Sequence, residues 1–221
     1  MRYLMMDTCG SEGSVALADT EAGGVMASQT LPGRSASERL LPVVRELLGA
    51  AGWKLAELSA IVVVHGPGSF TGVRAGLSAA KGLSEAGRVP LIAISRLAVL
   101  AELAESECGE VCAVLDAGRG EFYCGVYEAG RCVREALASM AEVEQASKTA
   151  GPVVVCEAKV AEALHTLKPV LVREPAAGDG LEIVTARASA GEFDDAAVVD
   201  ANYLRRTDAE IFAKPAQGPS R

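Results

Sequence analysis

The order of strands and turns at the start of the chain occurs a second time, and this duplication most constrains the fold. Residues 2–7 (RYLMMD) form an apolar strand pattern ending on Asp7, followed by a turn and a second strand pattern, SVALAD. About 109 residues later, VCAVLD ends on Asp116, and a turn and the strand pattern EFYCGVYEA follow. A repeat of this length predicts a duplicated subdomain and not a solenoid.

Helical and strand patterns fill the rest of each copy in the same order. Residues 35–52 and 71–86 have apolar side chains at helical spacing, while AIVVVH and VPLIAI are typical of buried parallel strands. The second copy follows this order more loosely. We therefore predict an α/β fold of two duplicated actin-like (ASKHA, ribonuclease-H-like) subdomains, the second one degenerate. The expected boundaries are 1–105, 106–210 for a smaller C-terminal subdomain, and 211–221 for a frayed tail.

Asp7 and Asp116 occupy the same place in the two copies. In an actin-like fold the first hairpin of each subdomain faces a shared cleft, where two carboxylates could hold a metal–phosphate complex. Aspartate is also common at the start of a tight turn, where it bonds to its own backbone. The sequence leaves both interpretations open: a vestigial nucleotide cleft, or turn chemistry alone.

A glycine-rich turn, HGPGSFTG, joins the strand pattern at 60–65 to the helix pattern that follows. It matches neither GxxxxGK[ST] nor GxGxxG, so it is not a standard phosphate loop. We expect Gly66, Gly68 and Gly72 to supply unusual backbone angles and Thr71 to cap the helix. An anion at the helix N-terminus remains an alternative to a purely structural connection.

The helix after this turn has a face of very small side chains, Gly72, Ala75, Gly76, Ala79 and Ala80. Such a face loses helix propensity at each glycine, so it must pack closely against another element. The partner is either the chain's own sheet or a helix of another chain. The preceding helix is predicted to begin with a capping box formed by Ser35 and Glu38, which the spacing allows.

Composition limits the class of protein. The net charge of −8 disfavours direct binding to a nucleic-acid backbone, so any role with nucleic acid is expected to be indirect.

No apolar run reaches the ~18 residues of a membrane span, and the N-terminus lacks a signal-peptide pattern, so we expect a cytoplasmic protein without membrane contact. Six cysteines without a CxxC pair, and only two histidines, predict reduced thiols and no metal site.

Three segments together resemble the TsaB (YeaZ) family: MMDTCGSEGSVAL, GPGSFTGVRAGLSAAKGL and the late DANYLRR. The resemblance covers most of residues 1–130 and returns at Tyr203, Leu204 and Arg205. It implies a role in forming N6-threonylcarbamoyladenosine beside the anticodon of tRNA. In that process the larger paralogue TsaD transfers the threonylcarbamoyl group, TsaB-type proteins dimerise with it, and the ATPase TsaE joins the assembly. It also implies a duplicated actin-like fold.

The chain departs from the catalytic paralogue where that relative has two metal-binding histidines four residues apart. Arg96 and Leu100 stand at the corresponding positions, and neither side chain can bind the metal. His65 and His165 are 100 residues apart, and His65 is expected to serve turn or core packing. The resemblance therefore implies a non-catalytic subunit with no catalytic residue and no metal.

The resemblance also places the partner surface on the helices at about 35–50 and 71–86. Without the paralogue, the same apolar patch would favour homodimers; tRNA is expected to be reached only through the complex. Arg74 and Lys81 could contact an acidic partner or a tRNA phosphate, or lie on a solvated flank. The predicted partner-binding residues are Leu40, Leu41, Val44, Val73, Arg74, Gly76, Leu77 and Ala80.

One alternative function comes from a different class. It is an actin-like ATPase or small-molecule kinase that uses Asp7 and Asp116 in a cleft with Mg²⁺. The missing phosphate-loop lysine speaks against it. No cofactor is expected; ATP with Mg²⁺ is expected to bind only weakly or at the partner interface.

Overall fold

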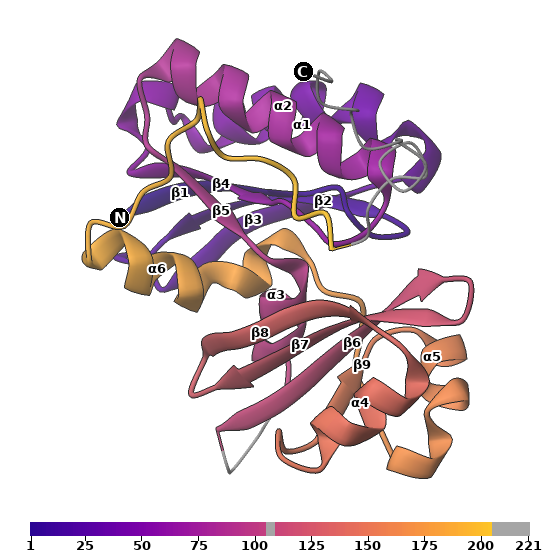
Figure 1. The fold of residues 1–221 in the computed structure, drawn as a ribbon. Helices are drawn as coiled ribbons and strands as arrows, with labels where there is room; N and C mark the ends of the chain where they lie inside the picture. The colour runs from indigo at the N-terminus through magenta and orange to yellow at the C-terminus, as the bar shows by residue number, and fades with distance from the viewer. Residues whose placement is uncertain (105–108, 205–221) are drawn as a thin grey trace, which may run out of the picture.

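The computed structural model describes residues 1–104 and 109–204, which form two five-stranded sheets with helices on and between them (Figure 1). The strand orders are β3-β2-β1-β4-β5 and β8-β7-β6-β9-β10, so the second sheet repeats the first. The strands are β1 Arg2–Asp7, β2 Gly13–Asp19, β3 Gly24–Leu31, β4 Ala60–Val64, β5 Leu91–Ile94, β6 Glu110–Gly118, β7 Glu121–Glu128, β8 Arg131–Ala138, β9 Val153–Val155 and β10 Val170–Leu171. The α-helices are α1 Ala36–Ala51, α2 Phe70–Gly87, α3 Arg96–Glu102, α4 Met140–Ser147, α5 Ala158–Ala163 and α6 Leu181–Ser189.

Both sheets combine an antiparallel meander with parallel strands. In the first sheet β1 pairs antiparallel with β2 and parallel with β4, and Asp7 lies opposite Ser14. In the second, β6 pairs antiparallel with β7 and parallel with β9, and Asp116 lies opposite Phe122. β9 and β10 have only three and two residues. The predicted duplication, with a reduced second copy, is confirmed.

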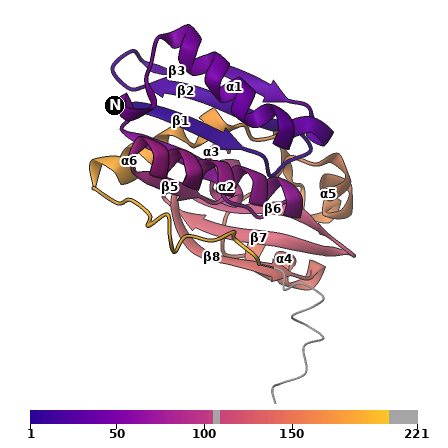
Figure 2. The ribbon, with the colours of Figure 1, turned by 90° about the horizontal axis from the view of Figure 1, so that it is seen from above.

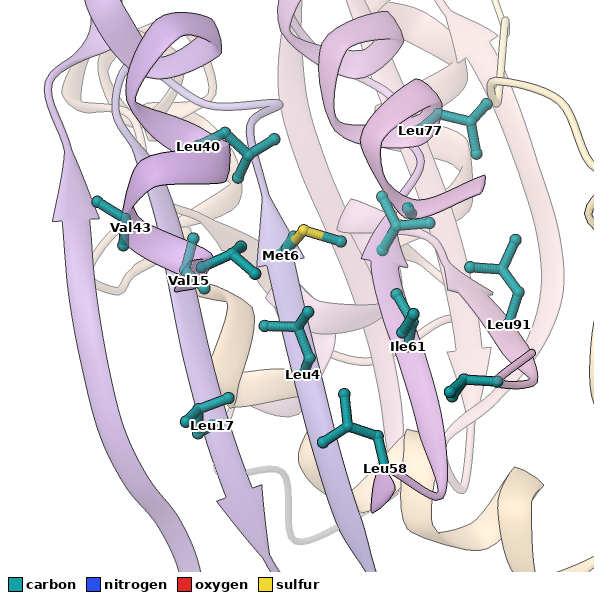
Figure 3. Close-up of a cluster of buried hydrophobic side chains, with 14 of the residues drawn as sticks. Leu4, Met6, Val15, Leu17, Leu40, Val43, Leu58, Ile61, Leu77 and Leu91 are labelled. Atoms are coloured by element: carbon teal, nitrogen blue, oxygen red, sulfur yellow. The ribbon is translucent and has the colours of Figure 1, made fainter. Parts of the chain in front are cut away.

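The largest core lies between the first sheet and the helices α1 and α2, which lie side by side on its outer face (Figures 1 and 2). Figure 3 shows Leu40 of α1 and Leu77 of α2 above Leu4 and Met6 of β1. These four side chains are no more than 6% exposed. Burying each such side chain stabilises the fold by about 1.5–3 kcal/mol, so this layer fixes both helices on the sheet.

The start of α1 differs from the prediction. Ser35 occupies the N-cap, but its side chain makes no capping hydrogen bond, and its hydroxyl donates to the carbonyl of Pro32 at 3.3 Å. The predicted capping box with Glu38 is wrong. A capping box does form at α4, where Ser139 and Glu142 bond to each other's backbone N–H.

Two helices lie between the sheets (Figure 1). Leu97 and Leu100 of α3 pack with side chains of the second sheet, whereas Val184 of α6 belongs to a cluster with Met5 of the first. The chain then continues along β5, where Asp194 accepts a hydrogen bond from the N–H of Ala93 at 2.7 Å. Helix α6 and the segment around Asp194, in the last part of the expected 106–210 subdomain, therefore pack on the first sheet, while Asn202 and Leu204 also contact the second.

Two further predictions concern the C-terminal tail and membrane-spanning segments. The expected tail, 211–221, and Arg205 of the late motif lie outside the described residues. Within the described part, every helix is too short or too polar to span a lipid bilayer.

Candidate functional site

Turns that follow β1, β4 and β5 meet at the carboxyl end of the first sheet. Ser69 donates its backbone N–H to the carbonyl of Cys9 at 2.8 Å, and Arg96 donates its backbone N–H to the carbonyl of Gly66 at 2.8 Å. The glycine-rich turn is therefore held on one side by the turn after β1 and on the other by the start of α3. Ends of parallel strands converge in this way, which is why ligands often bind there.

The glycines of this turn have different roles. Gly66 has φ of +107°, a conformation in which a side chain would be strained, as predicted. At Gly68 the decisive feature is close approach, because a Cβ atom would lie 2.3 Å from the carbonyl oxygen of Cys9. Gly72 does not have a positive φ, so the prediction of an unusual angle there is wrong. Ser69, and not Thr71, caps α2 by accepting from the N–H of Gly72 at 3.3 Å.

The small face of α2 packs against the chain itself. A Cβ atom on Gly72 would lie 1.9 Å from the carbonyl oxygen of Thr8, and one on Gly76 would lie 2.4 Å from its hydroxyl. That hydroxyl donates to the carbonyl of Gly72 at 2.6 Å. Of the two partners left open for this face, the structure therefore supports the chain's own sheet and the turn that follows β1.

The predicted partner-binding residues fall into two groups. Leu41 is 51% exposed, and Arg74 is exposed on α2. The other six lie in the chain's own interior, so another protein cannot contact their side chains without repacking the core. They are Leu40, Val44, Val73, Gly76, Leu77 and Ala80.

Asp7 lies at the end of β1, only 2% exposed. Its Oδ1 accepts from the N–H of Cys9 at 2.7 Å, and its Oδ2 lies 3.8 Å from Nε of the buried Arg96. Arg96 also donates through Nη2 to Glu174 at 2.8 Å. Burial raises the pKa of Asp7, and the Arg96 guanidinium opposes this only in part. For Arg96, burial acts to lower the pKa but the Asp7 carboxylate acts to raise it, and the net pKa is raised.

Glu174 completes this cluster from the second half of the chain. Its carboxylate accepts from the backbone N–H of Ser11 at 2.8 Å and from the Ser11 hydroxyl at 2.6 Å. A Cβ atom on Gly10 would lie 2.2 Å from Oε1 of Glu174 and 2.5 Å from Nη2 of Arg96. The side chains of Arg96 and Glu174 thus occupy the space beside Gly10 in the turn after β1.

Asp116 forms a salt bridge with Lys159. Its Oδ2 lies 2.5 Å from Nζ of Lys159, and its Oδ1 accepts from the N–H of Gly118 at 3.0 Å. The second bond is the turn chemistry expected of an aspartate at this position. The two matching aspartates therefore have separate charged partners, Arg96 and Lys159.

The late motif lies directly on the glycine-rich turn. The N–H of Asn202 donates to the carbonyl of His65 at 2.8 Å, and Nδ1 of His65 lies 2.9 Å from the carbonyl oxygen of Asp200. One residue further, the Tyr203 hydroxyl accepts from Nε of Arg74 at 2.7 Å. Segments about 130 residues apart thus form one surface at the start of α2. The predicted packing role of His65 in the turn is consistent with these bonds.

The sequence is similar to a known protein family and to curated proteins of bacteria. A family model described as TsaD, tRNA N6-adenosine threonylcarbamoyltransferase, matches residues 14–213. The chain is 38% identical over 130 residues to the tRNA threonylcarbamoyladenosine biosynthesis protein TsaB of Escherichia coli (strain K12), which covers 58% of this chain and 55% of that protein. For TsaB of Bacillus subtilis (strain 168) the identity is 40% over 92 residues, or 42% of this chain and 40% of that protein. The alignments thus span about half the length of these curated relatives.

Two solved structures extend the similarity to the whole fold. The structure described as YeaZ from Pseudomonas aeruginosa is 30% identical with a TM-score of 0.73, covering 91% of this chain and 100% of that chain. Another, described as an uncharacterized protein with similarity to peptidase YEAZ from Pseudomonas aeruginosa, is 31% identical with a TM-score of 0.76 and covers 92% and 99%. The chain belongs to the TsaB/YeaZ family.

Within this family, the positions predicted to match the paralogue's histidine pair have a structural role here. Arg96 is 5% exposed and pairs with Asp7, and Leu100 is fully buried in the core of the second sheet. The alternative of an ATPase or kinase needs Asp7 to reach a metal–phosphate complex. Its burial and its pairing with Arg96 disfavour that alternative.

Sequence reasoning missed two parts of this site. Glu174 has no local motif, because its partners Ser11 and Arg96 are 163 and 78 residues away. The contact between Arg74 and Tyr203 was also missed, although both residues lie in the segments that indicated the family. Their membership in the two most family-specific motifs was the available signal.

Proposed function

We propose that this chain is the TsaB-type subunit in the formation of N6-threonylcarbamoyladenosine on tRNA. In this proposal it dimerises with a TsaD-type threonylcarbamoyltransferase as a non-catalytic scaffold and activator. The observation that carries the proposal is the similarity to YeaZ over 91% of the chain, together with the TsaB relatives. The pairing of Arg96 with Asp7 and Glu174 supports a site built for structure and not for catalysis.

The contact with the TsaD-type partner is proposed to use the outward faces of α1 and α2. Leu41 is 51% exposed on α1, and Pro42 and Arg45 beside it are exposed as well. On α2, Arg74 and Ser78 are exposed at helical spacing. An exposed leucine beside charged side chains fits an apolar interface with a polar rim.

Three further features belong to the same proposal. Two copies are proposed to pair through these faces when the larger paralogue is absent, because related folds present related patches. A TsaE-type ATPase is proposed to join the complex, and tRNA to be reached through it. Any nucleotide is proposed to bind at the interface between partners and not between Asp7 and Asp116.

The test is co-expression with the TsaD-type paralogue of the same genome. We expect joint purification, and we expect N6-threonylcarbamoyladenosine in hydrolysed tRNA, measured by mass spectrometry, only when both proteins are present. Leu41→Glu is expected to weaken the complex roughly tenfold or more, because it places a carboxylate in an apolar contact. Met26→Glu, at a position on β3 that is 54% exposed, is the control and should bind normally. Modification by this chain alone would overturn the proposal.

A further inference from the structure

The guanidinium of Arg74 stacks on the ring of Phe70 and bonds to the hydroxyl of Tyr203 on the surface. Its Cζ lies 3.6 Å from the ring centroid of Phe70 and 5.7 Å from that of Tyr203, while Nε donates to the Tyr203 hydroxyl at 2.7 Å. The two ring centroids are 5.8 Å apart. Stacking and the hydrogen bond restrict the arginine side chain before anything binds to it, so less conformational entropy is lost on binding.

None of the described residues bonds to the terminal nitrogens of this guanidinium. Within the part of the chain that the structure describes, Arg74 has one hydrogen bond, through Nε, and no carboxylate in salt-bridge range. A guanidinium has five N–H donors, so its two terminal nitrogens keep theirs. Two parallel N–H groups on a planar, fixed fork match the two oxygens of a carboxylate. The site thus has the geometry of an anion receptor whose shape is already set.

The surroundings favour a protein carboxylate over a nucleic-acid phosphate. Phe70 is 46% exposed and Tyr203 is 39% exposed, so the cation is flanked by apolar rings. Arginine and aromatic side chains dominate the energetics of protein interfaces. A phosphate backbone needs several cations in a row, whereas Lys81 lies about two turns further along α2 and the chain carries a net charge of −8.

We propose that Arg74, held by Phe70 and Tyr203, is the receptor for an aspartate or glutamate side chain of a protein partner. This inference rests on the proposed function, which makes that partner the TsaD-type paralogue. Tyr203 acts as a positioning residue, since its hydroxyl sets the plane of the guanidinium without using the outer donors. In this proposal the late motif contributes to partner binding through Tyr203, in addition to the bond between Asn202 and the glycine-rich turn.

The first test measures the dissociation constant for the purified paralogue by calorimetry. Arg74→Gln is expected to weaken binding roughly tenfold or more, and Arg74→Lys also weakens it, because an ammonium keeps the charge but lacks the fork. Tyr203→Phe, which keeps the ring and removes the hydroxyl, is expected to weaken binding by a smaller factor. Arg131→Gln, which removes an exposed arginine on β8 of the second sheet, is the matched control and should stay within about twofold. Unchanged binding by Arg74→Gln overturns the inference and leaves the proposed function standing.

The second test uses this chain alone, at a concentration at which gel filtration shows a monomer, and decides the matter even if the paralogue does not bind. The Nε–Hε NMR signal of Arg74, assigned by its loss in Arg74→Lys, is followed during titration with sodium acetate. We expect it to saturate at a concentration several-fold lower than the signal of Arg45, an exposed arginine on α1. Sodium chloride and sodium phosphate are the comparison salts. Equal responses from Arg74 and Arg45, or a response to phosphate without one to acetate, would contradict the carboxylate assignment.

Discussion

Nη2 of Arg96 lies 2.8 Å from Oε1 of Glu174, which pairs the start of α3 with a residue 78 positions further along the chain. Nε of the same guanidinium lies 3.8 Å from Oδ2 of Asp7, and this nitrogen is buried without a hydrogen-bond partner among the described residues. Arg96 therefore connects the first strand, through charge alone, to the second half of the chain, through a charged hydrogen bond. Such a group is costly to leave unpaired, so its partners can be tested by substitution.

Replacing Arg96 alone should lower the free energy of unfolding much more than replacing Arg96 and Asp7 together. Arg96→Met leaves the buried carboxylate of Asp7 without its cation, and we expect a loss of about 3–5 kcal/mol in the free energy of unfolding. Asp7→Asn combined with Arg96→Met should recover much of this loss, since Asn keeps the acceptor for the Cys9 N–H. Urea unfolding of the two single variants and the double variant measures the coupling. Strictly additive effects would show that the two charges do not interact.

The pH dependence follows from the raised pKa of Asp7 in the folded chain. The folded state then binds this proton more tightly than the unfolded state, so protonation of Asp7 as the pH falls favours folding. We expect the unfolding free energy of the wild type, minus that of Asp7→Asn, to become more positive as the pH is lowered from neutral through the folded pKa. Urea titrations at several pH values give this difference. A change in the opposite direction would mean that the Arg96 charge outweighs burial and the net pKa of Asp7 is lowered.

Two glycines of α2 should respond to alanine with opposite signs. Gly82 is exposed, and a methyl group there would meet no neighbouring element within 4 Å in the described part of the chain, so Gly82→Ala is expected to stabilise the protein by about 0.5–1 kcal/mol. At Gly72 the new methyl group would lie 1.9 Å from the carbonyl oxygen of Thr8, and we expect a net loss of about 1–3 kcal/mol. Thermal unfolding distinguishes the two. Stabilisation by both substitutions would show that the contact with Thr8 is loose.

Cys156 should react slowly at neutral pH. Burial raises the pKa of its thiol to about 11, and the thiolate is the form that reacts with alkylating agents. Between pH 7.5 and 9.5 we therefore expect the rate of its alkylation by iodoacetamide to rise about tenfold per pH unit without levelling off. Peptide mass spectrometry follows this site separately from the exposed Cys132. A plateau below pH 9 would contradict the raised pKa.

Much of the fold was predictable because strand patterns and turns are local. The apolar runs ending at Asp7 and Asp116 correspond to β1 and to most of β6, and the strand order of the first sheet recurs in the second. Local signals were also misread. The Ser–x–x–Glu spacing at Ser139 marks the real capping box of α4, whereas the same spacing at Ser35 does not form one. A capping box depends on the backbone angles at its first residue, which the spacing alone does not specify.

The site was less predictable because it depends on contacts between distant residues. Apolar residues at helical spacing, such as Leu40 and Leu77, have the same pattern whether they face the chain's own sheet or another protein. Only the packing of α1 and α2 shows that Leu41 points outward while Leu40 is buried. Likewise, the glycines of α2 indicated a close neighbour, but the neighbour, Thr8, lies 64 residues before Gly72 in the chain.

The return of the last described segment to β5 has a consequence for how the protein can be made. Asp194 bonds to the backbone at Leu91 and Ala93, and Asn202 to that at His65, so the first sheet is completed by residues translated after the whole second sheet. During synthesis on the ribosome, the edge strand β5 of the first sheet stays uncovered until these residues have been translated. The two copies are therefore interleaved, and a gene split between them would leave the first half without its edge cover.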